Sequence, residues 1–227
     1  MKDWFYAFFM AWGMFLAIPC PFPRWRESAR GRMLVCLPLI GLAEGGLWPL
    51  LVWLLAKLHL PETVSALCAA AFPWLVTGFL HLDGYMDVCD AVLSRRDLAT
   101  RQKILKDSHC GAFAVIAMVL LALFQWAVCQ SVSLNEIPLL PLVLLPCAVR
   151  AAAALAVSHL RPLSTSQYAA QKTMPAGHTI ALVLMLAAAC ALPLIRDGIA
   201  GLAPLAAAAG YGLAVWFAFR QLDGMSG

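Results

Sequence analysis

Long apolar stretches alternate with short polar breaks along the whole chain. The apolar stretches are residues 4–18, 33–56, 63–80, 111–129, 137–158, 178–195 and 198–219, with boundaries good to a few residues. Since a helix needs ~20 mostly apolar residues to cross a bilayer, the pattern predicts an all-α polytopic membrane bundle with about six to seven membrane segments. The first stretch is short enough either to span the membrane or to lie in its interface. It runs into a proline cluster without a small-x-small cleavage site, so we expect it to be retained.

The composition agrees with this architecture. Apolar residues make up 63% of the 227 residues and charged residues 12%, whereas soluble domains are about half apolar and about a quarter charged. No polar stretch is long enough to build a soluble core, so residues 1–227 are expected to form a single membrane domain. The basic residues form no patch interleaved with aromatics, which argues against a nucleic-acid partner. The eight cysteines show no C-x-x-C spacing, which argues against a zinc or redox motif.

The positive charges are distributed unequally between the two sides of the predicted bundle. If the polar breaks alternate between sides, one side receives only Lys57 and Arg196. The other side receives Arg24, Arg26, Arg30, Arg32, Arg95, Arg96, Arg101, Lys103, Lys106, Arg161, Lys172 and Arg220. Because positive residues are retained in the cytoplasm, this richly charged side is predicted to be cytoplasmic. The polar segment 81–111 belongs to it, so its acidic residues are expected to face the cytoplasm.

Three of the few carboxylates lie close together in the stretch "TGFLHLDGYMDVCDAVLSRRD", residues 77–97. On a helix Asp83 and Asp87 are ~40° apart and Asp90 lies ~20° from Asp83, so all three share one face. The simplest interpretation is a solvated acidic face balanced by the arginines that follow. Acids beside an apolar span are costly and usually functional, however. We therefore favour a Mg²⁺ site, because this ion takes carboxylate ligands and is commonly shared with substrate phosphates.

Further candidate residues flank the three aspartates. Gly84 fits either the close approach of a ligand or a relaxed helix end. In "KDSHCG", Asp107 and Ser108 either cap the next helix or contact a phosphate at its N-terminus. His81 and His109 either bind substrate or lie at the membrane surface, and His81 is the stronger candidate because it adjoins Asp83.

Two charged residues fall inside predicted spans. Arg150, in "LLPCAVRAAAALAVSHL", either faces an acid or polar cavity, where it is a candidate substrate ligand, or extends to the membrane surface. Glu44 lies between Gly41, Gly45 and Gly46. It either faces a helix contact or lines the active cleft.

The ordered motifs resemble the cobalamin synthase family, whose members are adenosylcobinamide-GDP ribazoletransferases. "HLDGYMDVCDA" resembles the family motif H-L-D-G-x2-D-x2-D-G, and "KDSHCG" resembles D-S-R-x-G. "FLAIPCPFP", "LPLIGLAEGGL" and "AVRAAAAL" resemble three further family segments, so the resemblance runs in order across nearly the whole chain. Ala91, His109 and Glu44 depart from the family pattern. The resemblance also implies an aspartate and a final apolar helix after "LDGMSG", which this sequence does not contain.

The resemblance implies a reaction and a location. Adenosylcobinamide-GDP and α-ribazole, or its 5′-phosphate, are joined to give adenosylcobalamin, or its 5′-phosphate, with release of GMP. Asp83, Asp87 and Asp90 are expected to hold Mg²⁺ on the pyrophosphate, and Asp107 to complete the catalytic set. His81, Gly84, Ser108 and Arg150 are expected to contact substrate. The location is a bacterial-type inner membrane, with lipid around the chain; the oligomeric state is not fixed, and a homo-oligomer is one alternative.

Other functions fit less well. CDP-alcohol phosphatidyltransferases also cluster aspartates, but in a pattern like D-G-x2-A-R-x8-G-x3-D-x3-D, and here Asp83-Gly84 is followed by "YMDVCDA". A transporter would place its ion site near the bilayer midplane between repeated halves, and the chain shows no repeat. A purely structural membrane subunit would leave the acidic cluster unexplained.

Overall fold

The protein is described here by a computed structural model covering residues 2–132, 136–163, 166 and 174–225. Lys172, one of the predicted cytoplasmic charges, lies outside these residues, as does part of the 131–136 connection. The described residues form helices joined by turns and loops, and no strand is found among them. The helices are α1 (Lys2–Phe15), α2 (Arg30–Met33), α3 (Leu37–Lys57), α4 (Glu62–Val76), α5 (Leu80–Leu93), α6 (Leu98–Ile104), α7 (Ala112–Ser131), α8 (Leu139–His159), α9 (Ala176–Asp197) and α10 (Ala203–Leu222).

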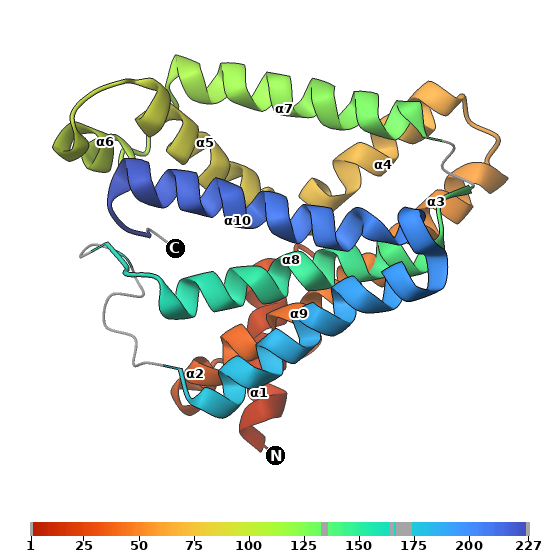
Figure 1. Cartoon of the computed structure of the whole chain (residues 1–227), viewed down its shortest axis with the longest axis horizontal. Helices are drawn as coiled ribbons and strands as arrows, with labels where there is room; N and C mark the ends of the chain where they lie inside the picture. The colour runs from red at the N-terminus through yellow and green to blue at the C-terminus, as the bar shows by residue number, and fades with distance from the viewer. Residues whose placement is uncertain (1, 133–135, 164–165, 167–173, 226–227) are drawn as a thin grey trace.

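The long helices lie roughly alongside one another (Figure 1). Helix α8 packs against α3, α9 and α10, while α7 packs against α4 and α5. The short 3-10 turn η4 (Gly198–Leu202) joins α9 to α10, and the chain reverses direction there (Figure 1). The acidic stretch is helical rather than an open loop, because α5 and α6 occupy most of residues 81–111.

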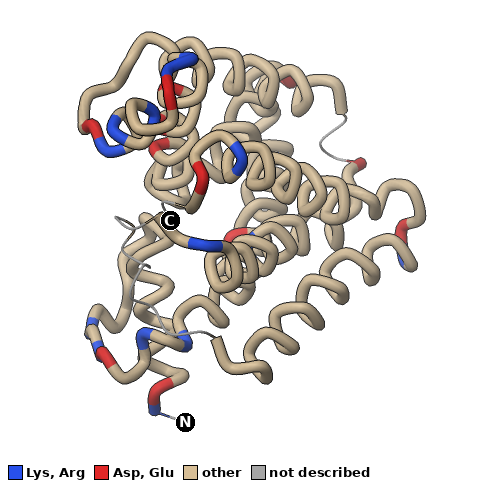
Figure 2. The backbone as a smooth tube through the Cα atoms, turned by 60° about the vertical axis from the view of Figure 1, so that its left-hand side comes forward, with Lys and Arg blue, Asp and Glu red and all other residues tan. Residues whose placement is uncertain are grey.

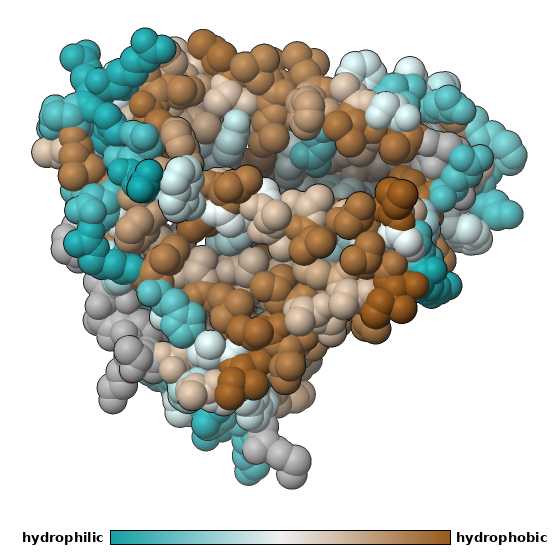
Figure 3. Space-filling view, viewed as in Figure 1, coloured by the Kyte–Doolittle hydropathy of each residue, from teal (hydrophilic) through white to brown (hydrophobic). Residues whose placement is uncertain are grey.

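The apolar surface has the extent expected of a membrane protein. Four helical stretches are long and apolar enough to cross a bilayer, or up to five if α4 and α5 form one bent span. The last of these stretches, Ala176–Leu222, contains both α9 and α10. Hydrophobic side chains form a broad band across one face, with hydrophilic side chains at both ends (Figure 3). The predicted all-α polytopic membrane bundle is confirmed, and the 14-residue α1 is not among the candidate spans.

The bend between α4 and α5 corrects the expected continuous span over residues 63–80. The two helices meet at 90°. Gly78 has φ +59° and Phe79 has φ +62°, so two successive residues adopt the left-handed conformation that ends a right-handed helix. The backbone N–H of Ala17 donates to the carbonyl of Val76 over 2.8 Å, which satisfies one of the exposed carbonyls at this helix end. The bend turns the acidic helix α5 away from the direction of α4.

Helices α3 and α8 approach each other closely at two glycines. A Cβ atom on Gly41 would lie 2.6 Å from the carbonyl oxygen of Pro146, and a Cβ on Gly45 would overlap the backbone of Val143. Small residues let membrane helices come into backbone contact in this way. Between them, Glu44 faces α8 and accepts hydrogen bonds from Nη2 and Nε of Arg150, at 2.6 and 3.1 Å. Each of these side chains is only 7% exposed.

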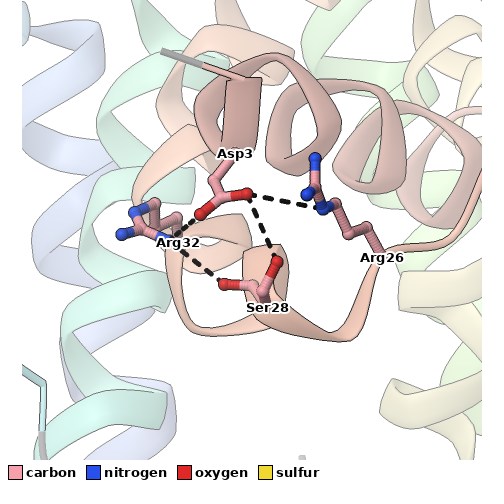
Figure 4. A network of polar contacts seen from close by, with 4 residues as sticks. All are labelled: Asp3, Arg26, Ser28 and Arg32. Carbon is pink, nitrogen blue, oxygen red and sulfur yellow. Dashed lines mark hydrogen bonds and ion pairs between the residues drawn. The ribbon is translucent and has the colours of Figure 1, made fainter.

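The N-terminal helix is fixed to the following segment by a polar network (Figure 4). Asp3 accepts hydrogen bonds from Arg32 at 3.1 Å and from the hydroxyl of Ser28 at 3.2 Å, and it forms an ion pair with Arg26 at 3.6 Å. The guanidinium groups of Arg26 and Arg32 also lie over the rings of Tyr6 and Trp4, respectively. These contacts hold α1 against α2 at a polar end of the bundle.

Candidate active site

Helix α5 presents its three aspartates to one cavity. Asp83, Asp87 and Asp90 all line a cavity of about 250 Å³ between α5, the end of α6 and the start of α7. The predicted helical spacing of these acids is therefore confirmed. The remaining lining residues are Met86, Ile104, Asp107, Ser108, His109, Cys110, Gly111 and Ala114.

The neighbours of α5 fix its orientation. Ala91 is fully buried in a cluster with Leu105, Leu163 and Leu222. Its methyl group, where the family motif has glycine, thus adds to the packing of α5. On another side of the helix, the hydroxyl of Tyr85 donates to the carbonyl of Ala117 in α7 over 3.4 Å.

Gly111 lies directly against Asp90. A Cβ atom at this glycine would overlap both carboxylate oxygens of Asp90. Gly111 is also the N-cap residue of α7, which has no side-chain cap. Of the two alternatives for Asp107 and Ser108, capping of this helix is therefore excluded, because the chain continues in a non-helical path as far as Gly111. The start of a helix favours negative charge, so the position of Asp90 is electrostatically favourable.

Asp107 is engaged locally instead. One of its carboxylate oxygens accepts a hydrogen bond from the backbone N–H of His109 at 3.0 Å and lies 2.6 Å from Nδ1 of the same residue. The His109 side chain, followed by its backbone N–H, lowers the pKa of Asp107. Asp107 is therefore a fully ionised carboxylate at neutral pH. His109, at the position of the family arginine, shapes this turn.

The other predicted contact residues are divided between the cavity and its surroundings. Ser108 lines the cavity, whereas His81, Gly84 and Arg150 do not. His81 is exposed on the first turn of α5, close enough to Arg150 for the arginine charge to act on it. Gly84 is exposed, with open space where a Cβ would lie. Arg150 is neither at the membrane surface nor in this cavity, because it is buried against Glu44.

Several lining residues were not singled out in the sequence. Met86, Ile104 and Ala114 are apolar, so their composition gives no functional signal. Cys110 and Gly111 lie within the "KDSHCG" motif, but their proximity to α5 depends on how α6 returns the chain to that helix. For Met86, the only signal in the sequence was its position on the helix relative to Asp83 and Asp87, which predicts that it faces the same side as these aspartates.

The carboxylates suit a magnesium ion that is shared with a ligand. Among the described residues, no three His, Cys, Asp or Glu side chains converge closely enough to enclose a metal ion by themselves. Mg²⁺ usually binds one or two carboxylates together with substrate phosphates and water, rather than a cage made of protein alone. The donor type and the shared cavity fit this mode, with Asp83, Asp87 and Asp90 as candidate ligands.

Known proteins resemble this chain over 43% to 66% of its length. Relatives named adenosylcobinamide-GDP ribazoletransferase include one from Clostridium perfringens strain 13, 43% identical over 151 residues, which are 66% of this chain and 60% of the relative. One from Clostridium botulinum strain Eklund 17B is 41% identical over 58% of this chain and 52% of the relative. One from Halalkalibacterium halodurans is 46% identical over 43% of this chain and 37% of the relative. No solved structure matches.

These matches cover at most 60% of the length of those relatives. The sequence profile described as cobalamin-5-phosphate synthase extends further along this chain and matches residues 7–227. The matched range includes α5, the α6–α7 turn and the α3–α8 contact. The chain therefore belongs to the cobalamin-5-phosphate synthase family.

Proposed function

We propose that the protein is an adenosylcobinamide-GDP ribazoletransferase that joins adenosylcobinamide-GDP to α-ribazole or its 5′-phosphate. Membership of the family supports this reaction. The observation that carries it is the convergence of Asp83, Asp87 and Asp90 with the α6–α7 turn on one cavity. Phosphoryl transfer depends mainly on positioning and charge stabilisation, which such a group of residues can supply.

The bond changes follow from the two substrates. A ribose hydroxyl of the ribazole attacks the phosphorus attached to cobinamide, and the bond from this phosphorus to the oxygen of GMP breaks. Because a 5′-phosphorylated acceptor gives a 5′-phosphorylated product, the attacking hydroxyl is not the one at the 5′ position. GMP leaves with the bonding electron pair, and the proton of the hydroxyl passes to a carboxylate.

The aspartates have different proposed roles in this reaction. When bound, Mg²⁺ neutralises charge on the pyrophosphate. Asp83, Asp87 and Asp90 are the proposed ligands for this ion, and one of the three also accepts the hydroxyl proton. Asp107 is the weaker candidate for the base, because one of its carboxylate oxygens is already engaged by the backbone N–H and the ring of His109. Its role is to hold the turn that carries Ser108 and His109 into the cavity.

The same proposal includes a location. The cavity lies between α5, the end of α6 and the start of α7. Helix α6 and its flanking residues carry Arg95, Arg96, Arg101, Lys103 and Lys106, and charged residues gather in this part of the molecule (Figure 2). We infer that this end faces the cytoplasm of a bacterial-type inner membrane, where nucleotides and Mg²⁺ are available. Lipid surrounds the apolar band.

The decisive experiment measures GMP release and corrinoid product from the detergent-solubilised chain. Adenosylcobinamide-GDP, α-ribazole and Mg²⁺ are supplied, and Asp83→Asn, Asp87→Asn and Asp90→Asn are compared with the wild-type chain. We expect Mg²⁺-dependent product that falls about 100-fold or more in the variants, because a missing base or ligand typically costs this much. A wild-type chain that forms no product at any Mg²⁺ concentration would contradict the proposal.

Asp97→Ser is the matched control. Asp97 is outside the cavity and caps α6 by accepting a hydrogen bond from the backbone N–H of Thr100 at 3.1 Å. Serine removes the carboxylate but is also a good N-cap residue. Activity is therefore expected to stay close to that of the wild-type chain, and a comparable loss in this variant would show that the aspartate effects are not specific to the cavity.

A further inference from the structure

A second cavity adjoins the aspartate cavity and has the opposite charge. It measures about 560 Å³ and is lined by Ala99, Gln102, Lys103, Lys106 and Asp107. Asp107 lines both cavities, so the two are neighbours. Its volume is within the range of small-molecule sites. The proposed reaction assigns no role to this cavity.

Helix α6, which supplies most of the lining, is held firmly against the end of α10. Arg101 donates to the side-chain oxygen of Gln221 at 2.6 Å and to its carbonyl at 3.2 Å. Gln102 donates to the carbonyl of Leu222 at 2.8 Å. Asp97 caps the start of the helix. The backbone that carries the two lysines is therefore fixed, although the lysine side chains are exposed.

The lysines are free to bind an anion. Lys103 and Lys106 are three residues apart, and the backbone N–H of Lys106 donates to the carbonyl of Lys103, so the helical turn continues between them and both face the same side. Neither forms an ion pair with any carboxylate in the described part of the chain. The charge of Lys103 acts on Asp107 from a distance. Two ammonium groups beside a pyrophosphate site form a suitable receptor for a phosphate monoester.

We propose that the cavity lined by Gln102, Lys103 and Lys106 is a binding subsite for a nucleoside phosphate monoester. This inference rests on the proposed function, which places a pyrophosphate at the neighbouring aspartates. Two groups in the reaction carry the required chemistry: the 5′-phosphate of the ribazole acceptor, and the phosphate of GMP, which becomes a monoester when it leaves the donor. Both belong to the groups that meet at the reacting phosphorus, and the lysine cavity shares Asp107 with the aspartate cavity in which that phosphorus is proposed to lie.

The test measures binding without turnover. Isothermal titration of the detergent-solubilised chain compares α-ribazole 5′-phosphate with α-ribazole, and GMP with guanosine. In the wild-type chain we expect at least one phosphorylated compound to bind about ten-fold or more tightly than its unphosphorylated partner, since hydrogen bonds to charged groups are stronger than neutral ones. In Lys103→Gln/Lys106→Gln this ratio is expected to fall to about one.

The two arms identify the source of the phosphate. A collapse of the ribazole ratio alone assigns the subsite to the acceptor, whereas a collapse of the GMP ratio alone assigns it to the donor. Arg96→Gln is the control, because Arg96 is an exposed basic residue of the same segment that lines neither cavity. Unchanged ratios in a double variant that retains the wild-type unfolding temperature would overturn the proposal. So would a wild-type chain that shows no preference for either phosphate.

Turnover measured in parallel separates this proposal from the proposed function. If the lysines determine phosphate binding but the wild-type chain forms no corrinoid product, the subsite stands and the reaction is wrong. If product forms with the same KM for both substrates in the wild-type and double-variant chains, the reaction stands and the subsite is wrong. An acceptor subsite predicts a raised KM for α-ribazole 5′-phosphate and an unchanged KM for α-ribazole.

Discussion

Because Gly111 has no side chain, the Asp90 carboxylate can lie against the start of α7. Gly111→Ala would place a methyl group on this carboxylate, so the Asp90 side chain must turn away. We expect GMP release to fall about ten-fold or more, because small displacements of positioning groups are costly in catalysis. The unfolding temperature should change by only a few degrees, since a shifted side chain relieves the overlap. Steady-state assay and thermal unfolding of the same preparation measure both effects.

Gly84→Ala is the control for this substitution. Gly84 is on α5 among the aspartates, but a Cβ there meets nothing within 4 Å. Alanine also favours the helix by about 1 kcal/mol over glycine. The variant should be at least as stable as the wild-type chain and retain its activity. Equal losses in Gly84→Ala and Gly111→Ala would show that overlap with Asp90 is not the cause.

The buried pair between Glu44 and Arg150 leads to a second prediction at the scale of single residues. Glu44→Gln removes the negative charge and leaves Arg150 buried without its counterion, which is expected to destabilise the protein by about 3–5 kcal/mol. The double variant Glu44→Met/Arg150→Met removes both charges and should recover most of this loss. Unfolding in detergent of Glu44→Met, Arg150→Met and the double variant, compared with the wild-type chain, gives the coupling energy directly. Additive losses would contradict the assigned pairing.

The sequence could predict the relative positions of residues only where they lie on the same helix. Asp83, Asp87 and Asp90 share a face because helical geometry relates positions three and four apart. The contact between Asp90 and Gly111 joins residues on different helices and depends on the path of α6. That Arg150 faces an acid was one of its alternatives, but the sequence did not identify Glu44 as that acid, because it gives the chemical need of a buried arginine and not the neighbouring helix. Of the two alternatives for Asp107 and Ser108, capping of α7 is excluded because Gly111 is the N-cap residue and the preceding turn is not helical.

At the scale of helices, the sequence located the apolar segments but not the bend. Residues 63–80 read as one continuous span, since apolar side chains continue through the break. The left-handed conformations of Gly78 and Phe79 interrupt the helix there. Glycine permits this conformation, but phenylalanine adopts it rarely, so the second residue gave no signal. The consequence is functional, because the direction of α5 determines which elements its aspartates face.

Close packing of α3 on α8 leads to a prediction at this scale. Gly41→Ala is expected to destabilise the protein by about 1–3 kcal/mol, because the new Cβ would press on the backbone of Pro146 and Cys147, which cannot move as a side chain can. Gly46→Ala is the matched control on the same helix, since nothing lies within 4 Å of its added Cβ. Thermal unfolding of the two variants in one detergent tests the difference. A Gly41 variant as stable as the Gly46 variant would contradict this packing.

The whole molecule has two different polar ends separated by the apolar band. Charged residues gather around α6 and the two termini, while the long helices between them carry few charges (Figure 2). The η4 turn lies at the other end, because α10 runs about 30 Å from it to the Gln221 contact with α6. The sequence predicted this asymmetry from the charges of the loops alone. Which end faces the cytoplasm is a separate question that accessibility can answer.

Cys110 provides the measurement. It is the exposed member of the eight cysteines and lies beside the aspartates, where a polar reagent can reach it. If this end is cytoplasmic, a membrane-impermeant maleimide should label Cys110 in inverted membrane vesicles and leave it unlabelled in intact cells. Cys110→Ser should abolish the labelling.

In that background Ile199→Cys, at an 87% exposed position in η4, should react from the outside of intact cells, because it lies at the opposite end. Labelling of Cys110 in intact cells and of the η4 cysteine only in inverted vesicles would reverse the orientation and place the aspartates away from cytoplasmic nucleotides.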